Sequence, residues 1–167
     1  MYKLLLVEDE DIIRETIVTC IDWAEIGFEV VEAEDGEAAL EIARQCLPAA
    51  VVTDVKMPIM DGLELTRALR RELPDTLVMV LSGHDEFRYA QQALELGVLE
   101  YITKPILPGD FTAAMIRLRQ RVQERDRQRQ GIEKLQSQLH HSLPLLRERF
   151  LNLMVNRPLP AEEISRS

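Results

Sequence analysis

Leu4-Leu5-Leu6-Val7-Glu8-Asp9 stands near the start of the chain and begins an alternation that continues through residue 105. A short apolar run that ends in acidic residues is typical of a strand buried on both faces and followed by a loop. Four more apolar runs follow, and stretches with the apolar spacing of helices separate them. The predicted strands cover residues 4–7, 28–33, 49–53, 76–81 and 98–102.

Strands that alternate with helices predict an α/β fold in which helices cover both faces of a parallel sheet. Right-handed crossover connections then give a doubly wound, five-stranded parallel sheet with the strand order 2-1-3-4-5. Ligands of such sheets bind beyond the carboxyl ends of the strands. The residues that follow each strand are therefore the candidates for a functional site.

The charge of the chain is unevenly distributed. Residues 1–105 contain 9 Lys and Arg against 22 Asp and Glu, whereas residues 106–167 contain 11 against 7. The acidic part is a poor candidate for binding nucleic acid, because phosphates repel carboxylates.

No apolar run approaches the roughly 20 residues of a membrane span, so we expect no membrane partner. Cys20 and Cys46 lack metal-binding spacing and indicate free thiols in a reducing cytoplasm.

Polar residues follow four of the predicted strands. They are Glu8 and Asp9 after the first strand, Asp54 after the third, Ser82 after the fourth and Lys104 after the fifth. Three neighbouring carboxylates repel one another and attract a cation, and oxygen ligands with room for water suit Mg²⁺. A nearby ammonium and hydroxyl suit an anionic group. Each residue alone is common as a cap or turn residue, but together they predict a site for a phosphoryl group carried on a carboxylate.

Residues 1–105, about two thirds of the chain, closely resemble the receiver domain of bacterial two-component response regulators. The resemblance implies a flavodoxin-like fold and a phosphorylation-activated regulator that is not an enzyme, although it takes part in its own phosphorylation and dephosphorylation. The motifs that carry it are Leu4-Leu5-Leu6-Val7-Glu8-Asp9-Glu10, Thr53-Asp54-Val55-Lys56-Met57-Pro58 with Met60-Asp61-Gly62, Leu81-Ser82-Gly83-His84 and Tyr101-Ile102-Thr103-Lys104-Pro105.

The resemblance implies that Asp54 accepts a phosphoryl group from a phosphohistidine on a sensor histidine kinase. It implies that Asp9, Asp54 and the backbone carbonyl of Lys56 bind Mg²⁺, with Glu8 acting directly or through water. Lys104 would pair with the phosphoryl oxygens.

Two further residues are implied to form a switch. Ser82 would move to hydrogen-bond the phosphoryl group, and Tyr101 would then turn inward. The Lys104–Pro105 peptide bond is expected to be cis.

The sequence departs from the family pattern in small ways. Glu8 replaces the commoner Asp, and Ser82 stands where Thr is common. Ile59 occupies a position where Gly is frequent, so its loop is expected to follow a backbone conformation that a β-branched residue tolerates. His84 and Lys56 stand at positions that tune dephosphorylation in this family, although His84 is equally explained as a surface loop residue.

Residues after Pro105 predict a long helix that begins near Asp110 and continues to about residue 139. Spacings of four, three and four residues indicate a coiled-coil seam that would form a homodimer. The alternative is a helix folded back on its own domain. The seam residues are Phe111, Met115, Leu118 and Val122.

A second helix is predicted from Ser142, with Pro144 in its first turn, and is expected to end at Pro158.

The predicted organisation is a receiver domain at 1–108, a helical coiled-coil linker at 109–140, and an amphipathic helix and tail at 141–167. The stretch Leu143-Pro144-Leu145-Leu146-Arg147-Glu148-Arg149-Phe150 resembles regulators that end in an AraC-type helix-turn-helix domain. No recognition-helix pattern occurs in residues 106–167, so we expect DNA binding only through an output domain absent from this chain.

Three other functions share part of this pattern. A haloacid-dehalogenase-like phosphatase also uses an aspartyl phosphate, but it is expected to have a second Asp where this chain has Lys56. A flavodoxin-like cofactor binder needs a Ser, Thr or Gly-rich loop after the first strand, where acidic residues stand here. A pseudo-receiver scaffold that never turns over phosphate stays open.

Overall fold

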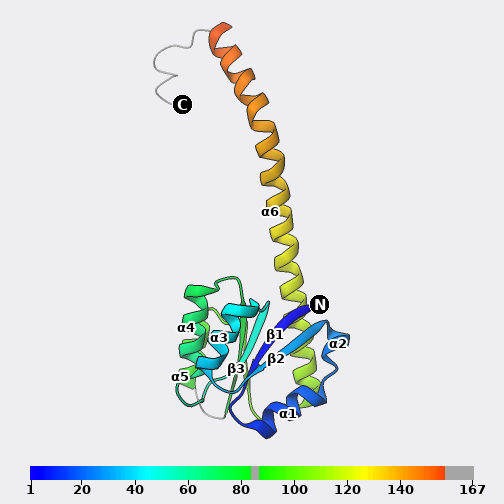
Figure 1. Ribbon diagram of the computed structural model, residues 1–167, viewed down its shortest axis with the longest axis vertical. Coiled ribbons are helices and arrows are strands. Elements are labelled where there is room, and N and C mark those ends of the chain that lie inside the picture. Colours follow the sequence, from blue (N-terminus) through cyan, green and yellow to red (C-terminus); the bar gives the residue numbers. More distant parts are fainter. Residues whose placement is uncertain (84–86, 157–167) are drawn as a thin grey trace. The chain divides into compact units, whose positions relative to one another are not determined.

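A computed structural model of the chain describes residues 1–83 and 87–156, with side chains for residues 1–83 and 88–140. His84 and the predicted helix end at Pro158 lie outside the described residues. The elements, shown in Figure 1, are β1 (Tyr2–Val7), α1 (Asp11–Cys20), α2 (Trp23–Ile26), β2 (Phe28–Ala33), α3 (Gly36–Cys46), β3 (Ala50–Asp54), α4 (Gly62–Glu72), β4 (Leu77–Ser82), α5 (Phe87–Glu95), β5 (Glu100–Thr103) and α6 (Pro108–Asn156).

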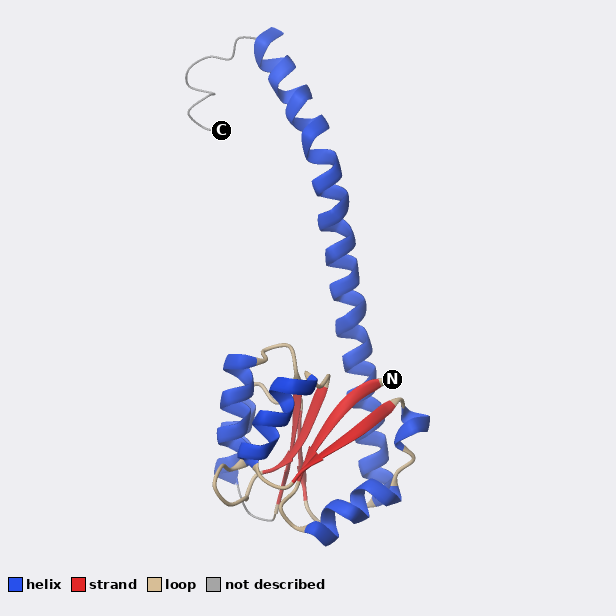
Figure 2. Cartoon of the chain, viewed as in Figure 1, coloured by secondary structure: helices blue, strands red, loops and turns tan. Residues whose placement is uncertain are grey.

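The strands form one five-stranded sheet in the order β2-β1-β3-β4-β5. Every neighbouring pair is parallel, with registers such as Val7 opposite Thr53 and Asp54 opposite Leu81. The predicted doubly wound, five-stranded sheet is therefore confirmed. Figure 2 shows the strands in red between two layers of helices.

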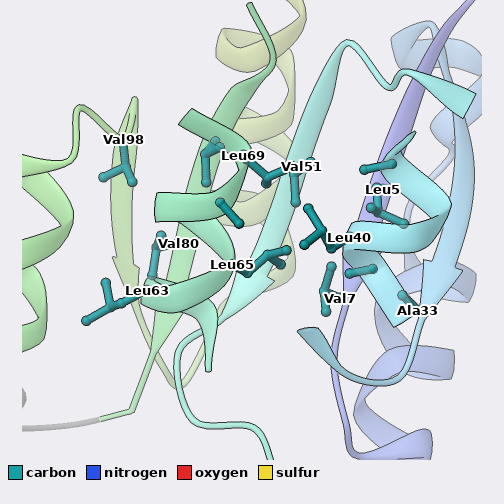
Figure 3. Close-up of a cluster of buried hydrophobic side chains, with 14 of the residues drawn as sticks. Leu5, Val7, Ala33, Leu40, Val51, Leu63, Leu65, Leu69, Val80 and Val98 are labelled. Carbon is teal, nitrogen blue, oxygen red and sulfur yellow. The ribbon is translucent and has the colours of Figure 1, made fainter. Parts of the chain in front are cut away.

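Each face of the sheet carries its own hydrophobic core. Side chains that alternate along the strands point to opposite faces, so β1 places Leu5 and Val7 on one face and Leu4 and Leu6 on the other. On the first face, α3 and α4 cover the sheet with side chains such as Leu40, Leu63, Leu65 and Leu69 (Figure 3). Burial on both faces explains why these strands are continuous apolar runs.

The first turns of α6 cover the second face and correct one of the sequence predictions. The four residues of the predicted coiled-coil seam are at most 2% exposed and lie in the core that includes Leu4, Leu6 and Trp23. They therefore pack on their own sheet and do not form a seam between two chains. Trp23 contacts Phe28 and Phe111 edge to face, with ring centroids 6.5 and 6.1 Å apart. The seam residues are Phe111, Met115, Leu118 and Val122.

Helix α6 runs without interruption from Pro108 to Asn156, so the separate helix predicted from Ser142 is not observed. A proline is favoured in the first turn of a helix, because in the interior it removes one N–H donor and crowds the preceding turn, so the sequence pattern at residues 142–144 favours a helix start that the backbone does not show. Two compact units, Met1–Gln123 and Glu124–Ser167, divide within this helix. In the second unit Ile132, Leu135 and Leu139 are 55, 60 and 56% exposed.

Helix α2, which the sequence analysis did not predict, fills the connection between α1 and β2. Asp22 caps the start of its single turn, since its carboxylate accepts a hydrogen bond from the Glu25 N–H at 3.2 Å, and Gly27, with a φ of 110°, caps its end. Within residues 1–83 and 87–156, none of the helices carries an apolar stretch long enough to cross a bilayer.

Candidate functional site

The carboxyl ends of β1, β3, β4 and β5 lie at one edge of the sheet and bring distant residues together. The register places Ser82 opposite Thr103, and the Lys104 N–H donates to the Ser82 carbonyl at 2.6 Å. On the other side, the Glu8 N–H donates to the Ala33 carbonyl at 3.1 Å and continues the pairing of β1 with β2 beyond its last residue. The sheet thus fixes the backbone on which the predicted site residues stand.

Three carboxylates form the centre of this edge. Each of Glu8, Asp9 and Asp54 offers one oxygen, and these oxygens all lie within 4.8 Å of one another. Glu8 is fully buried, Asp54 is 6% exposed and Asp9 is half-buried. Asp54 is oriented by the Val55 N–H, which donates to its Oδ1 at 2.8 Å. This leaves Asp54 Oδ2 directed at the ammonium of Lys104.

Lys104 supplies the positive charge that faces this cluster. Its Nζ lies 3.1 Å from Asp54 Oδ2 and 3.3 Å from Glu8 Oε2. Burial by itself would lower the pKa of Lys104, but the charges of Asp54 and Glu8 and their hydrogen bonds outweigh burial and raise the pKa above its ordinary value. Lys104 is therefore a permanent cation here. The peptide bond to Pro105 is cis, as expected.

Burial and the neighbouring charge of Asp54 both disfavour the ionised form of the Glu8 carboxyl. Burial, and then the charge of Asp54, raise the pKa of Glu8 from 4.5 to about 7. Its Oε1 is buried and has no hydrogen-bond partner among the described residues. Together with the carboxylates of Asp9 and Asp54, this unpaired oxygen gives three hard oxygen ligands. Such a set fits a small divalent cation such as Mg²⁺.

The remaining predicted residues surround this centre. Ser82 is fully buried at the end of β4, and Tyr101 on β5 is half-buried against the core on the α3–α4 face. Lys56 is exposed and lines a cavity of about 500 Å³. The complete lining of that cavity is Asp9, Val55, Lys56, Met57, Pro58, Asp61 and Tyr89.

Tyr89 in this lining was not predicted from the sequence. It lies on α5, outside the strand-end motifs that carried the prediction, and it packs partly against the core. Only the winding of α5 beside the loop after β3 brings it to the cavity, so no local sequence signal could have identified it.

The loop after β3 differs from its predicted conformation. Ile59 has a φ of 71°, in the left-handed region that β-branched residues avoid, so the expectation that its backbone would suit such a residue is wrong. The loop turns tightly here, because the Met60 N–H donates to the Pro58 carbonyl at 2.8 Å and the Gly62 N–H to the Val55 carbonyl at 2.8 Å. These two bonds set the backbone that Ile59 must follow.

Gly62 closes this loop against the strand that carries Asp54. A Cβ atom at Gly62 would overlap the backbone oxygen of Asp54, so only glycine permits this approach. Asp61, just before it, caps α4 by accepting from the Glu64 N–H at 2.8 Å.

The three carboxylates and Lys104 together can hold a divalent cation, neutralise an anion and offer the oxygen of Asp54 as a nucleophile.

A family model described as the response regulator receiver domain matches residues 4–116. Among curated relatives, the uncharacterized transcriptional regulatory protein YesN of Bacillus subtilis is 32% identical, over 93% of this chain and 42% of the relative. The transcriptional regulatory protein HptR of Staphylococcus aureus strain N315 is also 32% identical, over 94% of this chain and 61% of the relative. The chain thus spans less than two thirds of the length of these relatives.

Solved structures give the same family. The REC domain of AraT, a response regulator from Geobacillus stearothermophilus, matches with a TM-score of 0.71 and 42% identity, over 75% of this chain and 98% of that one. A two component transcriptional regulator AraC from Clostridium phytofermentans matches with a TM-score of 0.68 and 31% identity, over 77% of this chain and 99% of that one.

Proposed function

Because the chain belongs to the response regulator receiver domain family, we propose that it is a phosphorylation-activated regulator whose Asp54 accepts a phosphoryl group from a sensor histidine kinase. The observation that supports this most is the meeting of three carboxylates with the Lys104 ammonium, 3.1 Å from Asp54 Oδ2. Receiver domains are generally not classical enzymes, and this one would act as substrate and partial catalyst of its own modification.

In the proposed transfer, an oxygen of Asp54 attacks the phosphorus of a phosphohistidine. The new O–P bond replaces the P–N bond, and the imidazole of the kinase leaves with a proton from solvent. Glu8, Asp9, Asp54 and the backbone carbonyl of Lys56 would hold Mg²⁺, which supplies charge neutralisation at the phosphoryl oxygens. Lys104 pairs with the same oxygens from the other side.

Ser82 and Tyr101 are the proposed switch. Both lie near the carboxyl end of the β4–β5 pair, Ser82 buried and Tyr101 half-buried. A hydroxyl that turns toward a phosphoryl group leaves space that a neighbouring ring can fill, so phosphorylation would favour one of two arrangements over the other.

The proposed output is transcriptional and cytoplasmic, since the named relatives are transcriptional regulators, and DNA would be bound only by a segment outside this chain. Ile132, Leu135 and Leu139 form an exposed apolar stripe with spacings of three and four, which supports a homodimer through this part of α6.

The nucleophile is tested by incubating the chain with Mg²⁺ and acetyl phosphate and weighing the intact protein by mass spectrometry. Wild type is expected to gain one phosphoryl group and Asp54→Asn none. Asp75→Asn, at an exposed position before β4, is the matched control and is expected to label like wild type. Equal labelling of wild type and Asp54→Asn would refute the assignment.

The dimer is tested separately by analytical ultracentrifugation with and without acetyl phosphate. Leu135→Lys is expected to give monomers, because it places a charge in the apolar stripe. Ser137→Lys adds the same charge on the opposite side of the helix and is expected to leave the dimer intact. A wild-type chain that is monomeric in both conditions removes the dimer and leaves the acidic site untouched.

A further inference from the structure

We propose that Arg14 is a positioning residue for the acidic pair Glu8–Asp9, and that it sets the affinity of the site for Mg²⁺ by fixing the peptide bond between these two acids. The inference rests on the proposed function, because it concerns the same metal site. Arg14 lies on α1, outside every motif that marked the site in the sequence.

The contact that carries the proposal is made to the backbone. Arg14 Nη1 donates to the carbonyl oxygen of Glu8 at 2.7 Å. This oxygen belongs to the peptide group that joins Glu8 to Asp9, so the bond fixes the orientation of that peptide plane. The plane sets the torsion angles on both sides of it, and these determine where the two carboxylates point.

The guanidinium is itself held in place. Its Nη2 donates to Asp11 Oδ1 at 2.6 Å, and its Nε lies 3.3 Å from Glu32 Oε1 on β2. All three nitrogens are therefore engaged, and the side chain of Arg14 is only 15% exposed. The guanidinium is planar and already held by two carboxylates, so it loses little conformational freedom when it also binds the Glu8 carbonyl oxygen.

The Glu8–Asp9 peptide needs such support because β1 ends just before it. The Glu8 N–H is still bonded to the Ala33 carbonyl, at 3.1 Å, but the loop between β1 and α1 then leaves the sheet. The N-cap residue of α1, Glu10, makes no side-chain capping bond. Arg14 therefore supplies the side-chain anchor between the end of the sheet and the first turn of the helix.

Charge and geometry predict opposite effects when Arg14 is removed. As a nearby cation, Arg14 repels Mg²⁺, so loss of its charge alone would tighten metal binding. As the anchor of the Glu8–Asp9 peptide, it pre-organises two of the ligands, so its loss would weaken metal binding. Mutation of a residue that orients metal ligands typically lowers the affinity for the metal by about 10- to 100-fold. The sign of the change therefore separates the two roles.

The experiment is an isothermal titration of the 167-residue chain with MgCl₂, in the absence of any phosphodonor. Arg14→Gln is expected to weaken Mg²⁺ binding by about tenfold, at the lower end of that range. Arg44→Gln is the matched control, because it removes a bidentate ion pair with Glu72, at 2.7 and 2.8 Å, that makes no contact with the acidic site. It is expected to bind Mg²⁺ like wild type.

Unchanged or tighter binding by Arg14→Gln would overturn the proposal and leave Arg14 as a helix-stabilising residue. If Arg14→Gln is unfolded by circular dichroism, Arg14→Lys decides: it keeps the charge but not the fork, so weakened binding supports the proposal and wild-type binding overturns it. Wild type that binds no Mg²⁺, or binds no better than Asp9→Asn, overturns both this inference and the proposed metal site.

Discussion

Glu8 is the residue at which the electrostatics of the site become measurable. It is fully buried, it faces Asp54 and Lys104, and its pKa is raised to about 7, chiefly by burial. In the unfolded chain the pKa of the same carboxyl is near its ordinary value of 4.5. The folded protein therefore keeps a proton that the unfolded chain loses between these two values.

The contribution of Glu8 to the stability of the metal-free chain is expected to fall as pH rises from about 4.5 to about 7, because Glu8 holds its proton in the folded state and loses it in the unfolded state in this window. Below the window both states are protonated, and the contribution is fully present. Glu8→Gln cannot ionise and should lack this fall. Urea unfolding at several pH values measures it, and parallel curves for wild type and Glu8→Gln would contradict the raised pKa.

Ile59 is expected to be less favourable than glycine at its own position. Its φ of 71° costs an L-residue about 1–2 kcal/mol, and its side chain is 76% exposed, so little burial is lost on removal. Since glycine gives up about 0.5–1 kcal/mol through the flexibility of the unfolded chain, Ile59→Gly should raise the free energy of unfolding by up to about 1.5 kcal/mol.

The same substitution in a helix is the control for this prediction. Ile12 is 80% exposed on α1, where glycine is a poor helix former, so Ile12→Gly should lower the free energy of unfolding by about 0.5–1 kcal/mol. Thermal unfolding of both variants tests the contrast. A loss of stability in both would show that Ile59 is not strained.

At the scale of elements, two glycines illustrate how differently the same residue type can act. Gly62 begins α4 against the backbone of Asp54, whereas a Cβ at Gly131, inside α6, would meet no atom within 4 Å. Gly131→Ala should raise the helix content by removing a penalty of about 1 kcal/mol. Gly62→Ala should lower the free energy of unfolding by about 1–3 kcal/mol, because the strand and loop must separate. Circular dichroism with thermal unfolding measures both changes.

The elements also show what the sequence could and could not predict. The strands and their order followed from apolar runs and the handedness of crossovers, and the acidic cluster followed from where those strands end. Spacings of three and four residues are the same for a helix packed on a sheet and for a coiled coil. The sequence alone therefore could not assign Phe111 and Met115 to the domain core. The turn at α2 and the φ of Ile59 depend on hydrogen bonds between backbone groups, which leave no mark in the pattern of side chains.

At the scale of the whole molecule, the domain core extends well past the last strand. The compact unit is Met1–Gln123, and it includes five α6 residues that are at most 2% exposed, four of them larger than alanine. Losing buried side chains of this size costs about 2–5 kcal/mol each, whereas domains are stable by only about 5–15 kcal/mol. The boundary predicted at residue 108 can therefore be tested directly.

A chain that ends at residue 123 is expected to unfold cooperatively in urea, whereas a chain that ends at residue 108 should not fold. The expected difference arises because the shorter chain lacks the α6 side chains that cover the second face of the sheet together with α1 and α2. Urea unfolding followed by circular dichroism distinguishes the two chains. A folded 1–108 chain would show that α6 is dispensable for the core.

Trp23 gives this core an intrinsic fluorophore. It is the only tryptophan in the chain, it is 7% exposed, and its ring meets Phe111 of α6 edge to face. Its emission should shift to longer wavelength when α6 leaves the sheet, because the indole then enters water. Detachment of the helix can therefore be followed in real time without attaching a dye, while the acidic site at the opposite end of the strands is left chemically unaltered.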